Sequence, residues 1–182
     1  MNDTLEKLFS PDDINEHYAV LLALAGKRKR IAECGIGYGR LTDLLLTTYP
    51  EVLCSCDHRY DDIVQSAVTR IKSSAEKRGT AFSFERCDSR VFDIKDVDLL
   101  IIDSYGAYLQ VLPELINLSP YVSEYICIHN TSIYGERTEW GGSPSLRQGI
   151  EDFLARNSKW TKIYEYGHNN GMTILKRVDP GN

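Results

Sequence analysis

Three glycines spaced two residues apart form the segment of this chain best suited to holding a ligand. They lie in Glu33-Cys34-Gly35-Ile36-Gly37-Tyr38-Gly39. Glycine lets the backbone turn tightly and lets a bound molecule approach it closely. The dinucleotide fingerprint is Gly-x-Gly-x-x-Gly, with a pyrophosphate at the start of a helix. Here the spacing is shorter and Glu33 precedes it, and a carboxylate attracts an ammonium or sulfonium group but repels a pyrophosphate. The segment predicts a loop for a cationic ligand, with a ligand-free tight turn as the alternative.

Polar residues follow at two later points where strands are expected to end. Asp57, which comes 18 residues after Gly39, is placed to accept hydrogen bonds from both hydroxyls of a ribose. Its alternative role is to cap the next helix. Asp88 with Ser89 is placed to accept a hydrogen bond from the amino group of adenine, or else simply forms a turn. His58 borders the same region. Tyr38 in the glycine loop either packs over the ligand or is a plain loop aromatic.

The elements that must position these residues alternate between strand and helix. Short apolar runs predict the strands, and segments with apolar residues at helical spacing predict the helices. Gly167-His168-Asn169-Asn170 between the last two strands is a hairpin signal. The expected strands are 30–34, 51–56, 81–87, 97–102, 123–129, 160–166 and 171–177, and the expected helices are 12–26, 40–48, 60–78, 107–118 and one from Ser143-Pro144 to Arg156.

This alternation predicts an α/β fold. We expect a Rossmann-like, doubly wound, seven-stranded and mostly parallel sheet with helices on both faces and a C-terminal antiparallel β-hairpin. Such sheets bind ligands at the carboxyl ends of their strands, and those ends carry the glycine loop, Asp57, Asp88, Asp103 and His129-Asn130. We expect one domain over residues 1–182, made of an N-terminal helical segment (1–29) and the Rossmann-like core (30–182).

The composition is that of a folded, acidic protein. Of the 182 residues 42% are hydrophobic, and the formal net charge is −5, whereas a nucleic-acid-binding surface is basic. The one basic cluster, 27–30, is expected to be a solvated helix end, with phosphate binding as the alternative. No apolar run approaches the ~20 residues that cross a bilayer, and the acidic start predicts no secretion signal. The five cysteines form no Cys-x-x-Cys pair, so we expect reduced core thiols rather than a zinc site, and a cytoplasmic location.

Together these motifs resemble those of class I S-adenosylmethionine-dependent methyltransferases. Residues 33–39 look like the first motif of that family, Asp57 like the second, Asp88 like the third and Asp103-Ser104 like the fourth. The seven strands with their terminal hairpin fit the family's sheet, so the likeness covers nearly the whole chain. It implies S-adenosylmethionine as cofactor and methyl transfer as the reaction. The cofactor-binding residues that it implies are Glu33, Gly35, Gly37, Tyr38, Gly39, Asp57, His58, Asp88, Ser89 and Asp103.

Local strings are similar to a narrower branch, the cephalosporin-hydroxylase-like and sugar O-methyltransferase-like proteins. That branch often has DINEH before the first strand, IDS with a tyrosine-bearing turn, HDT after the fifth strand, and NNGLTVLKR near its end. The matching segments here are Asp13-Ile14-Asn15-Glu16-His17, Ile102-Asp103-Ser104-Tyr105, His129-Asn130-Thr131 and Asn169-Asn170-Gly171-Met172-Thr173-Ile174-Leu175-Lys176-Arg177.

One departure from the branch concerns a metal ion. In its better-known members, acids after the fourth and fifth strands hold a divalent metal beside the acceptor hydroxyl. Asp103 keeps the first role, but Asn130 stands where the second acid is expected. An amide oxygen binds Mg²⁺ more weakly than a carboxylate because it carries no charge. Whether Asp103 and Asn130 hold Mg²⁺ is therefore left open.

The resemblance also implies a mechanism. Methyl transfer from a sulfonium is an in-line displacement in which the protein mainly aligns donor and acceptor. An acceptor hydroxyl must lose its proton, and the candidates to take it are His129 and Asp103, with Asn130 or a metal lowering the acceptor's pKa. These three residues are the predicted catalytic set.

Two further segments are expected near the acceptor. The turn between the last two strands lies at the same edge of the sheet, which brings His168, Asn169 and Asn170 toward Asn130. The segment 131–144, which contains Trp140, is long enough to cover the acceptor; its alternative is an ordinary surface loop.

The sequence thus predicts an enzyme that methylates a hydroxyl, or an amine, of a small-molecule acceptor. A non-catalytic S-adenosylmethionine-binding module is the alternative that His129-Asn130 favours, because an acidic pair is missing there. An RNA methyltransferase is a further alternative, although there is no basic patch and no NPPY-type tetrapeptide. An NAD(P)-linked enzyme is disfavoured by the glycine spacing and Glu33. No membrane partner is expected, and a homodimer is compatible with the resemblance.

Overall fold

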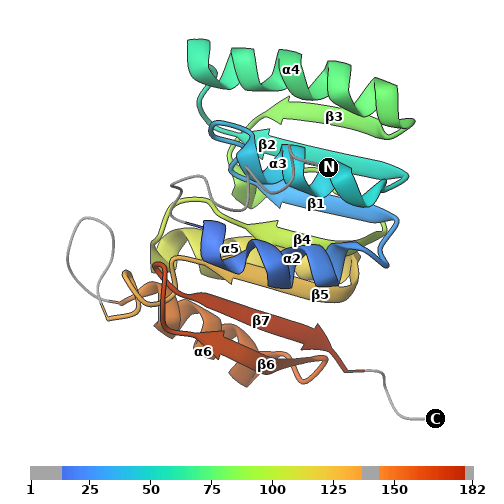
Figure 1. Ribbon diagram of the computed structural model, residues 1–182. Coiled ribbons are helices and arrows are strands. Elements are labelled where there is room, and N and C mark those ends of the chain that lie inside the picture. The colour runs from blue at the N-terminus through green and yellow to red at the C-terminus, as the bar shows by residue number, and fades with distance from the viewer. Residues whose placement is uncertain (1–13, 137–143, 179–182) are drawn as a thin grey trace.

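The seven expected strands are all present and form one sheet. The computed structural model describes residues 14–136 and 144–178. The strand order is β3-β2-β1-β4-β5-β7-β6 (Figure 1). The strands are β1 (Arg30–Cys34), β2 (Val52–Asp57), β3 (Ala81–Arg86), β4 (Val97–Ile102), β5 (Val122–His129), β6 (Trp160–Tyr166) and β7 (Met172–Arg177).

The helices follow the expected pattern with shifts at their ends. The α-helices are α2 (Tyr18–Ala25), α3 (Arg40–Leu45), α4 (Asp62–Arg78), α5 (Tyr108–Leu118) and α6 (Leu146–Arg156), and the short 3-10 turns are η1 (Asn15–His17), η2 (Leu46–Thr48), η3 (Ser89–Val91) and η4 (Ser119–Tyr121). The prediction that Ser143-Pro144 opens the last helix is wrong. Ser145 caps that helix instead, because its side chain accepts the backbone N–H of Gln148 at 3.2 Å. Trp140 and the first two residues of the expected helix 12–26 lie outside the described residues.

Five strands run parallel, and the C-terminal pair reverses the pattern. Strands β3, β2, β1, β4 and β5 pair in parallel with one another. Strand β7 then enters antiparallel between β5 and β6. The predicted fold class, a mostly parallel seven-stranded sheet with a C-terminal antiparallel hairpin, is therefore confirmed. The parallel arrangement brings the carboxyl ends of β1, β2 and β4 to one edge, which is where ligands bind in sheets of this kind.

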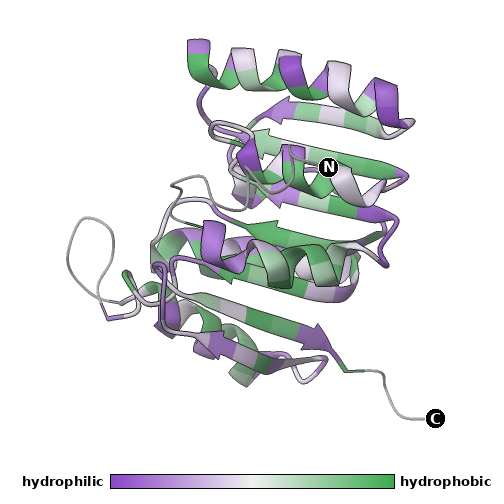
Figure 2. Cartoon of the chain, viewed as in Figure 1, coloured by the Kyte–Doolittle hydropathy of each residue, from purple (hydrophilic) through white to green (hydrophobic). Residues whose placement is uncertain are grey.

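Helices cover both faces of the sheet, as predicted. Helices α2, α3 and α4 bury one cluster of apolar side chains against the sheet, and α5 and α6 bury a second cluster on the opposite face (Figure 1). Strands β1 and β4 lie in the middle and are buried on both faces, and β4 is apolar along almost its whole length (Figure 2). Between β3 and β4 the described chain has only the turn η3 and no α-helix.

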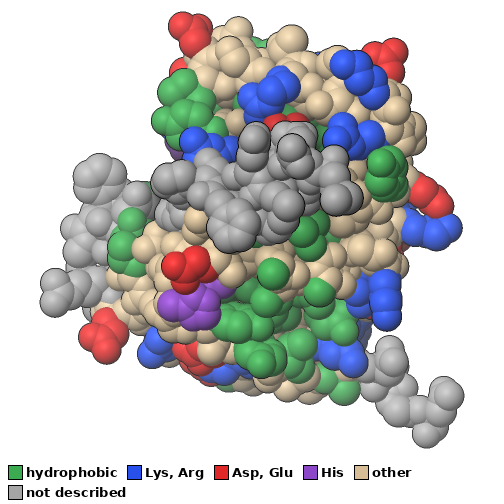
Figure 3. Space-filling model, viewed as in Figure 1, with side chains coloured by type: hydrophobic (Ala, Val, Ile, Leu, Met, Phe, Trp, Pro, Cys, Tyr) green, Lys and Arg blue, Asp and Glu red, His purple; other side chains and the backbone are tan. Residues whose placement is uncertain are grey.

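The face that carries α2 is not fully closed over its apolar side chains. Val20, Leu24, Tyr125 and Tyr166 are only partly buried against the core there. Hydrophobic side chains accordingly gather over α2 and the strands next to it in Figure 3. No helix of residues 14–136 and 144–178 is both long and apolar enough to span a bilayer.

Candidate functional site

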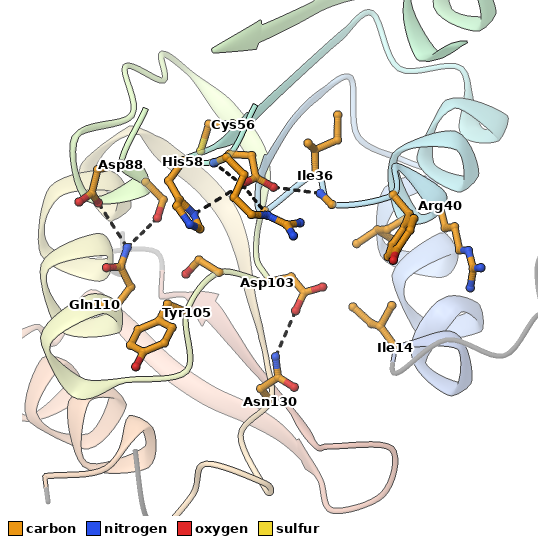
Figure 4. Close-up of a pocket in the computed structure, with 18 residues that line it drawn as sticks. Ile14, Ile36, Arg40, Cys56, His58, Asp88, Asp103, Tyr105, Gln110 and Asn130 are labelled. Carbon is orange, nitrogen blue, oxygen red and sulfur yellow. Dashed lines mark hydrogen bonds and ion pairs between the residues drawn. The ribbon is translucent and has the colours of Figure 1, made fainter. Parts of the chain in front are cut away.

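A cavity of about 690 Å³ opens at the carboxyl edge of the sheet (Figure 4). Its walls come from the glycine loop after β1, the ends of β2 and β4, the turn after β3 and the residue after β5. Most of the predicted site residues line it: Gly35, Gly37, Tyr38, Asp57, His58, Asp88, Ser89, Asp103 and Asn130. Segments far apart in the sequence thus converge on one hollow because the parallel strands end together.

The glycine loop is held in a conformation that other residues rarely adopt. Gly35, Gly37 and Gly39 have φ of 95°, 48° and 72°. A Cβ on Gly35 would lie 2.1 Å from the carbonyl oxygen of Asp103, so the first glycine is required by the close approach of β4. The N–H groups of Gly35 and Ile36 both donate to the carbonyl of Cys56. The loop is thereby fixed to the end of β2. Gly39 does not line the cavity and instead precedes α3 as its N-cap residue.

Asp57 is the last residue of β2 and points under the glycine loop. Its Oδ2 accepts the N–H of Gly37 at 3.1 Å, and its Oδ1 accepts the N–H of Arg59 at 2.9 Å. Asp57 as a whole residue is only 6% exposed. The helix-capping alternative for Asp57 is wrong, because Asp61 caps α4 by accepting the N–H of Val64. Each carboxylate oxygen can accept a further hydrogen bond, so Asp57 remains able to bind ribose hydroxyls.

Asp88 and Ser89 combine the two roles that the sequence left open. Asp88 caps the turn η3 by accepting the N–H of Arg90 at 2.9 Å, and it also pairs with the Arg90 guanidinium. Its hydrogen bonds to this guanidinium hold the pKa of the Asp88 carboxyl well below its usual range. Both Asp88 and Ser89 nevertheless line the cavity. Asp88 is therefore a turn residue whose ionised carboxylate also borders the hollow.

Glu33 lies in a different place from the one expected. Its side chain is fully buried beneath the glycine loop, where Oε2 accepts the hydroxyls of Thr42 and Ser55, both at 2.7 Å. It does not line the cavity. Side chains alternate along a strand, and Glu33 in β1 points toward α3. Burial raises the pKa of Glu33 to about 7. Glu33 is therefore not placed to contact a cationic ligand in the cavity, contrary to the expectation from the sequence.

Asp103 and His129 form a hydrogen-bonded pair at the ends of β4 and β5. The Nδ1 atom of His129 lies 2.8 Å from Oδ1 of Asp103, and Nδ2 of Asn130 donates to the same oxygen at 3.3 Å. The side chain of Asp103 is 22% exposed toward the cavity, but that of His129 is fully buried. His129 therefore stands behind Asp103 and does not line the hollow. This corrects the expectation that its ring takes a proton directly from an acceptor.

The hairpin turn packs against this pair, as the sequence suggested. The carbonyl oxygen of Asn169 lies 3.3 Å from Nε2 of His129 and 3.1 Å from Nε2 of His17. The N–H of Ser132 donates to the carbonyl of Asn170 at 2.8 Å. The turn thus fixes the rear of the Asp103–His129 pair. His168 lies beside His17, with ring centroids 5.1 Å apart, rather than in the cavity.

The residues beside Asp103 do not fit a magnesium ion. Mg²⁺ prefers several oxygen ligands in octahedral geometry. Here Asn130 turns its amide nitrogen toward Asp103, and Oδ1 of Asp103 accepts from that amide and lies next to the His129 ring. Among the described residues, no group of three or more His, Cys, Asp or Glu side chains is arranged to hold a metal. The described donor set supplies one carboxylate, so we derive no step through a metal ion.

Several residues of this region were not among the site residues predicted from the sequence, including Arg59, Gln110 and Glu114. Arg59 and Gln110 line the cavity. Glu114 does not line it, but it lies directly behind Ser89, Ser104 and Gln110. A signal for Glu114 was present, because it falls on the same helical stripe as Val111, Leu115 and Leu118, all of which are buried.

Comparisons with known proteins identify the class of fold. No family model matches the sequence, and no curated protein matches it either. Solved structures do match over almost the whole chain, and several of them are described as methyltransferases. The chain therefore has the Rossmann-like fold of class I S-adenosylmethionine-dependent methyltransferases, as the motifs predicted.

Three of these structures illustrate the likeness. An O-methyltransferase from Bacillus cereus, in complex with S-adenosylhomocysteine, matches with a TM-score of 0.70 and 14% identity over 98% of this chain and 92% of that one. An O-methyltransferase from Streptomyces achromogenes involved in tomaymycin synthesis, in complex with S-adenosylmethionine, has a TM-score of 0.69 and 15% identity over 97% and 88%. Magnesium protoporphyrin IX methyltransferase from Synechocystis, with bound S-adenosylmethionine, has a TM-score of 0.66 and 11% identity over 97% and 91%. At these identities the likeness establishes the fold.

Proposed function

We propose that this protein is an S-adenosylmethionine-dependent methyltransferase that acts on a hydroxyl of a small molecule. One observation carries the proposal: the glycine loop, Asp57, Asp88 and Asp103 line one cavity at the edge of a methyltransferase-type sheet. The matched structures that hold S-adenosylmethionine or its product support the choice of cofactor.

The residues present fit such a cofactor. The Gly37 N–H and the Arg59 N–H fix the Asp57 carboxylate, which leaves its remaining lone pairs for two ribose hydroxyls. Gly37 leaves open space beside the loop, because an added Cβ there would meet only the Arg59 guanidinium, at 4.0 Å. The carboxylates of Asp57, Asp88 and Asp103 outnumber the guanidinium groups of Arg40 and Arg59 in the cavity wall, and the resulting negative charge attracts a sulfonium and an ammonium group. When bound, the cofactor supplies an activated methyl group.

The chain's own contribution to the reaction is to position the acceptor and hold its proton. We assign proton acceptance to Asp103, because its carboxylate borders the cavity while His129 does not. His129 orients Asp103 by contacting Oδ1, and Asn130 donates to the same oxygen. The second oxygen, Oδ2, is then the atom toward which an acceptor hydroxyl donates. Asp103 is the catalytic residue of this proposal, and His129 is a positioning residue.

The size of the cavity favours a small acceptor. At about 690 Å³ it falls in the range of ordinary small-molecule sites, ~300–1,000 Å³, which must here hold both the nucleoside donor and the acceptor. The net charge of −5 also disfavours RNA, which requires a positive surface.

Ligand-induced stabilisation provides the first test. S-adenosylhomocysteine is expected to raise the unfolding temperature of the purified protein, whereas NAD is not. Asp57→Ala should lose this stabilisation while folding normally, and calorimetry should show at least a tenfold weaker affinity, because ~1.5–3 kcal/mol belongs to hydrogen bonds with a charged group. A wild-type protein that shows no affinity for S-adenosylhomocysteine refutes the proposal.

Turnover then separates an enzyme from a binding module. Candidate acceptors with hydroxyl groups, amines and RNA are screened for the release of S-adenosylhomocysteine. Release with a small hydroxylated acceptor supports the proposal. If S-adenosylhomocysteine is released only with RNA or only with amines, that class replaces the small hydroxylated molecule as the proposed acceptor. Binding of the cofactor without release on any acceptor favours the non-catalytic module.

A further inference from the structure

A buried carboxyl group stands directly behind one end of the cavity. Glu114 in α5 is fully buried. Its Oε1 accepts hydrogen bonds from the Ser89 hydroxyl, from the Ser104 hydroxyl at 2.6 Å and from Nε2 of Gln110 at 2.9 Å. Its Oε2 has no hydrogen-bond partner among the described residues. All three donors line the cavity, although Glu114 itself does not.

Stability alone does not account for this arrangement. Burying a carboxyl group with one unpartnered oxygen is unfavourable, and burial raises the pKa of Glu114 from its ordinary value. An apolar side chain of similar volume at this stripe of α5 would pack against Val111, Leu115 and Leu118 without that penalty. What Glu114 adds is a single acceptor shared by three side chains of the cavity wall.

The shared acceptor determines where the protons of that wall point. A serine hydroxyl has one proton, and Ser89 and Ser104 each direct theirs at Glu114. The amide nitrogen of Gln110 faces Ser89 Oγ at 2.7 Å, Glu114 Oε1 at 2.9 Å and Asp88 Oδ1 at 3.4 Å. If the side-chain amide of Gln110 were flipped, its oxygen would face these three acceptor oxygens. The amide nitrogen is therefore the atom that points toward Glu114.

Four side chains therefore present acceptor atoms to this end of the cavity, where His58 and Tyr105 also line it. The acceptors are the hydroxyl lone pairs of Ser89 and Ser104, the amide oxygen of Gln110 and the carboxylate of Asp88. In Figure 4 Asp88 and Gln110 lie at the end of the hollow opposite Ile14. If a ribose binds at Asp57 and the tail of the cofactor at the glycine loop, the base extends toward this end.

We propose that Glu114 is a positioning residue that makes this end of the cavity selective for hydrogen-bond donors on the bound base, and hence for an aminopurine over an oxopurine. The inference rests on the proposed function, and it adds the residue that sets the base preference. An exocyclic amine donates to these four side chains, whereas an oxygen at the same position faces their acceptor atoms.

The test compares two ligands that differ at this one position. Calorimetry measures the affinities of S-adenosylhomocysteine and S-inosylhomocysteine for the wild type, Glu114→Met and Glu114→Gln. The wild type should prefer the amino ligand about 10- to 100-fold, the range for a buried polar group left unpaired. Glu114→Met should reduce that preference by at least about threefold, since the hydroxyls and the Gln110 amide are then free to rotate, while the Asp88 carboxylate stays in place through Arg90. Glu114→Gln keeps an acceptor oxygen and should retain most of the preference.

Stability measurements separate positioning from a structural role. Glu114→Met should unfold at the same temperature as the wild type or higher, while its base preference falls. Glu151→Met, on the exposed side of α6, is the matched control and should alter neither quantity. If Glu114→Met fails to fold, the Ser89→Ala/Ser104→Ala double variant should show the reduced preference with Glu114 intact.

Each remaining outcome decides against the inference. An unchanged base preference in Glu114→Met, or an equal loss of both ligands with a lower unfolding temperature, overturns it and leaves Glu114 a structural residue. A wild type that binds both ligands equally also overturns it while the proposed function stands. A wild type that binds neither ligand overturns the proposed function and the inference together.

Discussion

Replacing Glu33 by glutamine is expected to remove a loss of stability that the wild type suffers as the pH rises. Burial beneath the glycine loop raises the pKa of Glu33 from its ordinary value of 4.5 to about 7. The folded state then holds this proton more tightly than the unfolded state does. The contribution of this protonated carboxyl to the free energy of unfolding is fully present below about pH 4.5. It is lost as the pH rises toward 7, where the carboxyl must ionise inside the protein.

The magnitude follows from the size of the shift. A rise in the pKa of Glu33 from 4.5 to about 7, at ~1.36 kcal/mol for each tenfold change in proton affinity, corresponds to about 3 kcal/mol in total. Most of this, about 2 to 3 kcal/mol, is lost between pH 5 and pH 8, because the unfolded carboxyl is already mostly ionised at pH 5. Glu33→Gln cannot ionise, and it keeps an oxygen for the hydroxyls of Thr42 and Ser55.

Urea unfolding at pH 5, 6, 7 and 8, followed by circular dichroism, measures this difference. The free energy of unfolding of the wild type should fall relative to that of Glu33→Gln by about 2 to 3 kcal/mol across the range. Glu76→Gln, which changes an exposed residue of α4, is the matched control and should run parallel to the wild type. Parallel curves for the wild type and Glu33→Gln would refute the reasoning that Glu33 titrates in the buried site.

Three further predictions concern the loop, the reaction and a helix end. Gly35→Ala should destabilise the fold by more than about 3 kcal/mol in urea unfolding, since its Cβ meets a backbone carbonyl at 2.1 Å. Gly79→Ala also has positive φ but no atom within 4 Å of the added Cβ, so a loss of only about 1 kcal/mol is expected; equal losses would contradict the steric argument. Asp103→Asn should lower kcat at least about 100-fold with little change in the affinity for S-adenosylhomocysteine, and full activity would remove Asp103 from the mechanism. Ser145→Ala should cost about 1 kcal/mol through loss of the α6 cap, and an unchanged urea midpoint would show that the cap is not stabilising.

The elements of the fold were predictable because hydrophobic pattern and turn residues agree along most of the chain. Strands β1, β4 and β6 begin and end at the expected residues. The start of α6 was not predictable from Pro144, because two competing helix starts stand side by side there. The side chain of Ser145 decided between them by bonding the N–H of Gln148.

The site was predictable as a set of strand ends but not in the direction of every side chain. Asp57 and Asp103 line the cavity as expected because each lies at or next to the end of a strand. Glu33 lies inside its strand, where alternation turned it toward α3, and a motif pattern does not record that direction. His129 is the last residue of its strand, but its side chain is buried behind Asp103. A motif pattern does not record that direction either.

Glu114 was missed because its partners come from three separate segments. It bonds side chains from η3, from the loop after β4 and from its own helix. Only the helical stripe indicated its burial. No local spacing connects it to Ser89, and that contact spans 25 residues.

The place of β7 between β5 and β6 has a consequence for biosynthesis. Because the final strand of the sheet pairs with both of them, a nascent chain leaving the ribosome exposes the edge of β5 until β7 has been translated. The turn that precedes β7 also supplies the Asn169 carbonyl behind His129. The Asp103–His129 pair thus gains this support only after residue 169 has been translated, and a chain that stops before that residue has an open edge prone to aggregation.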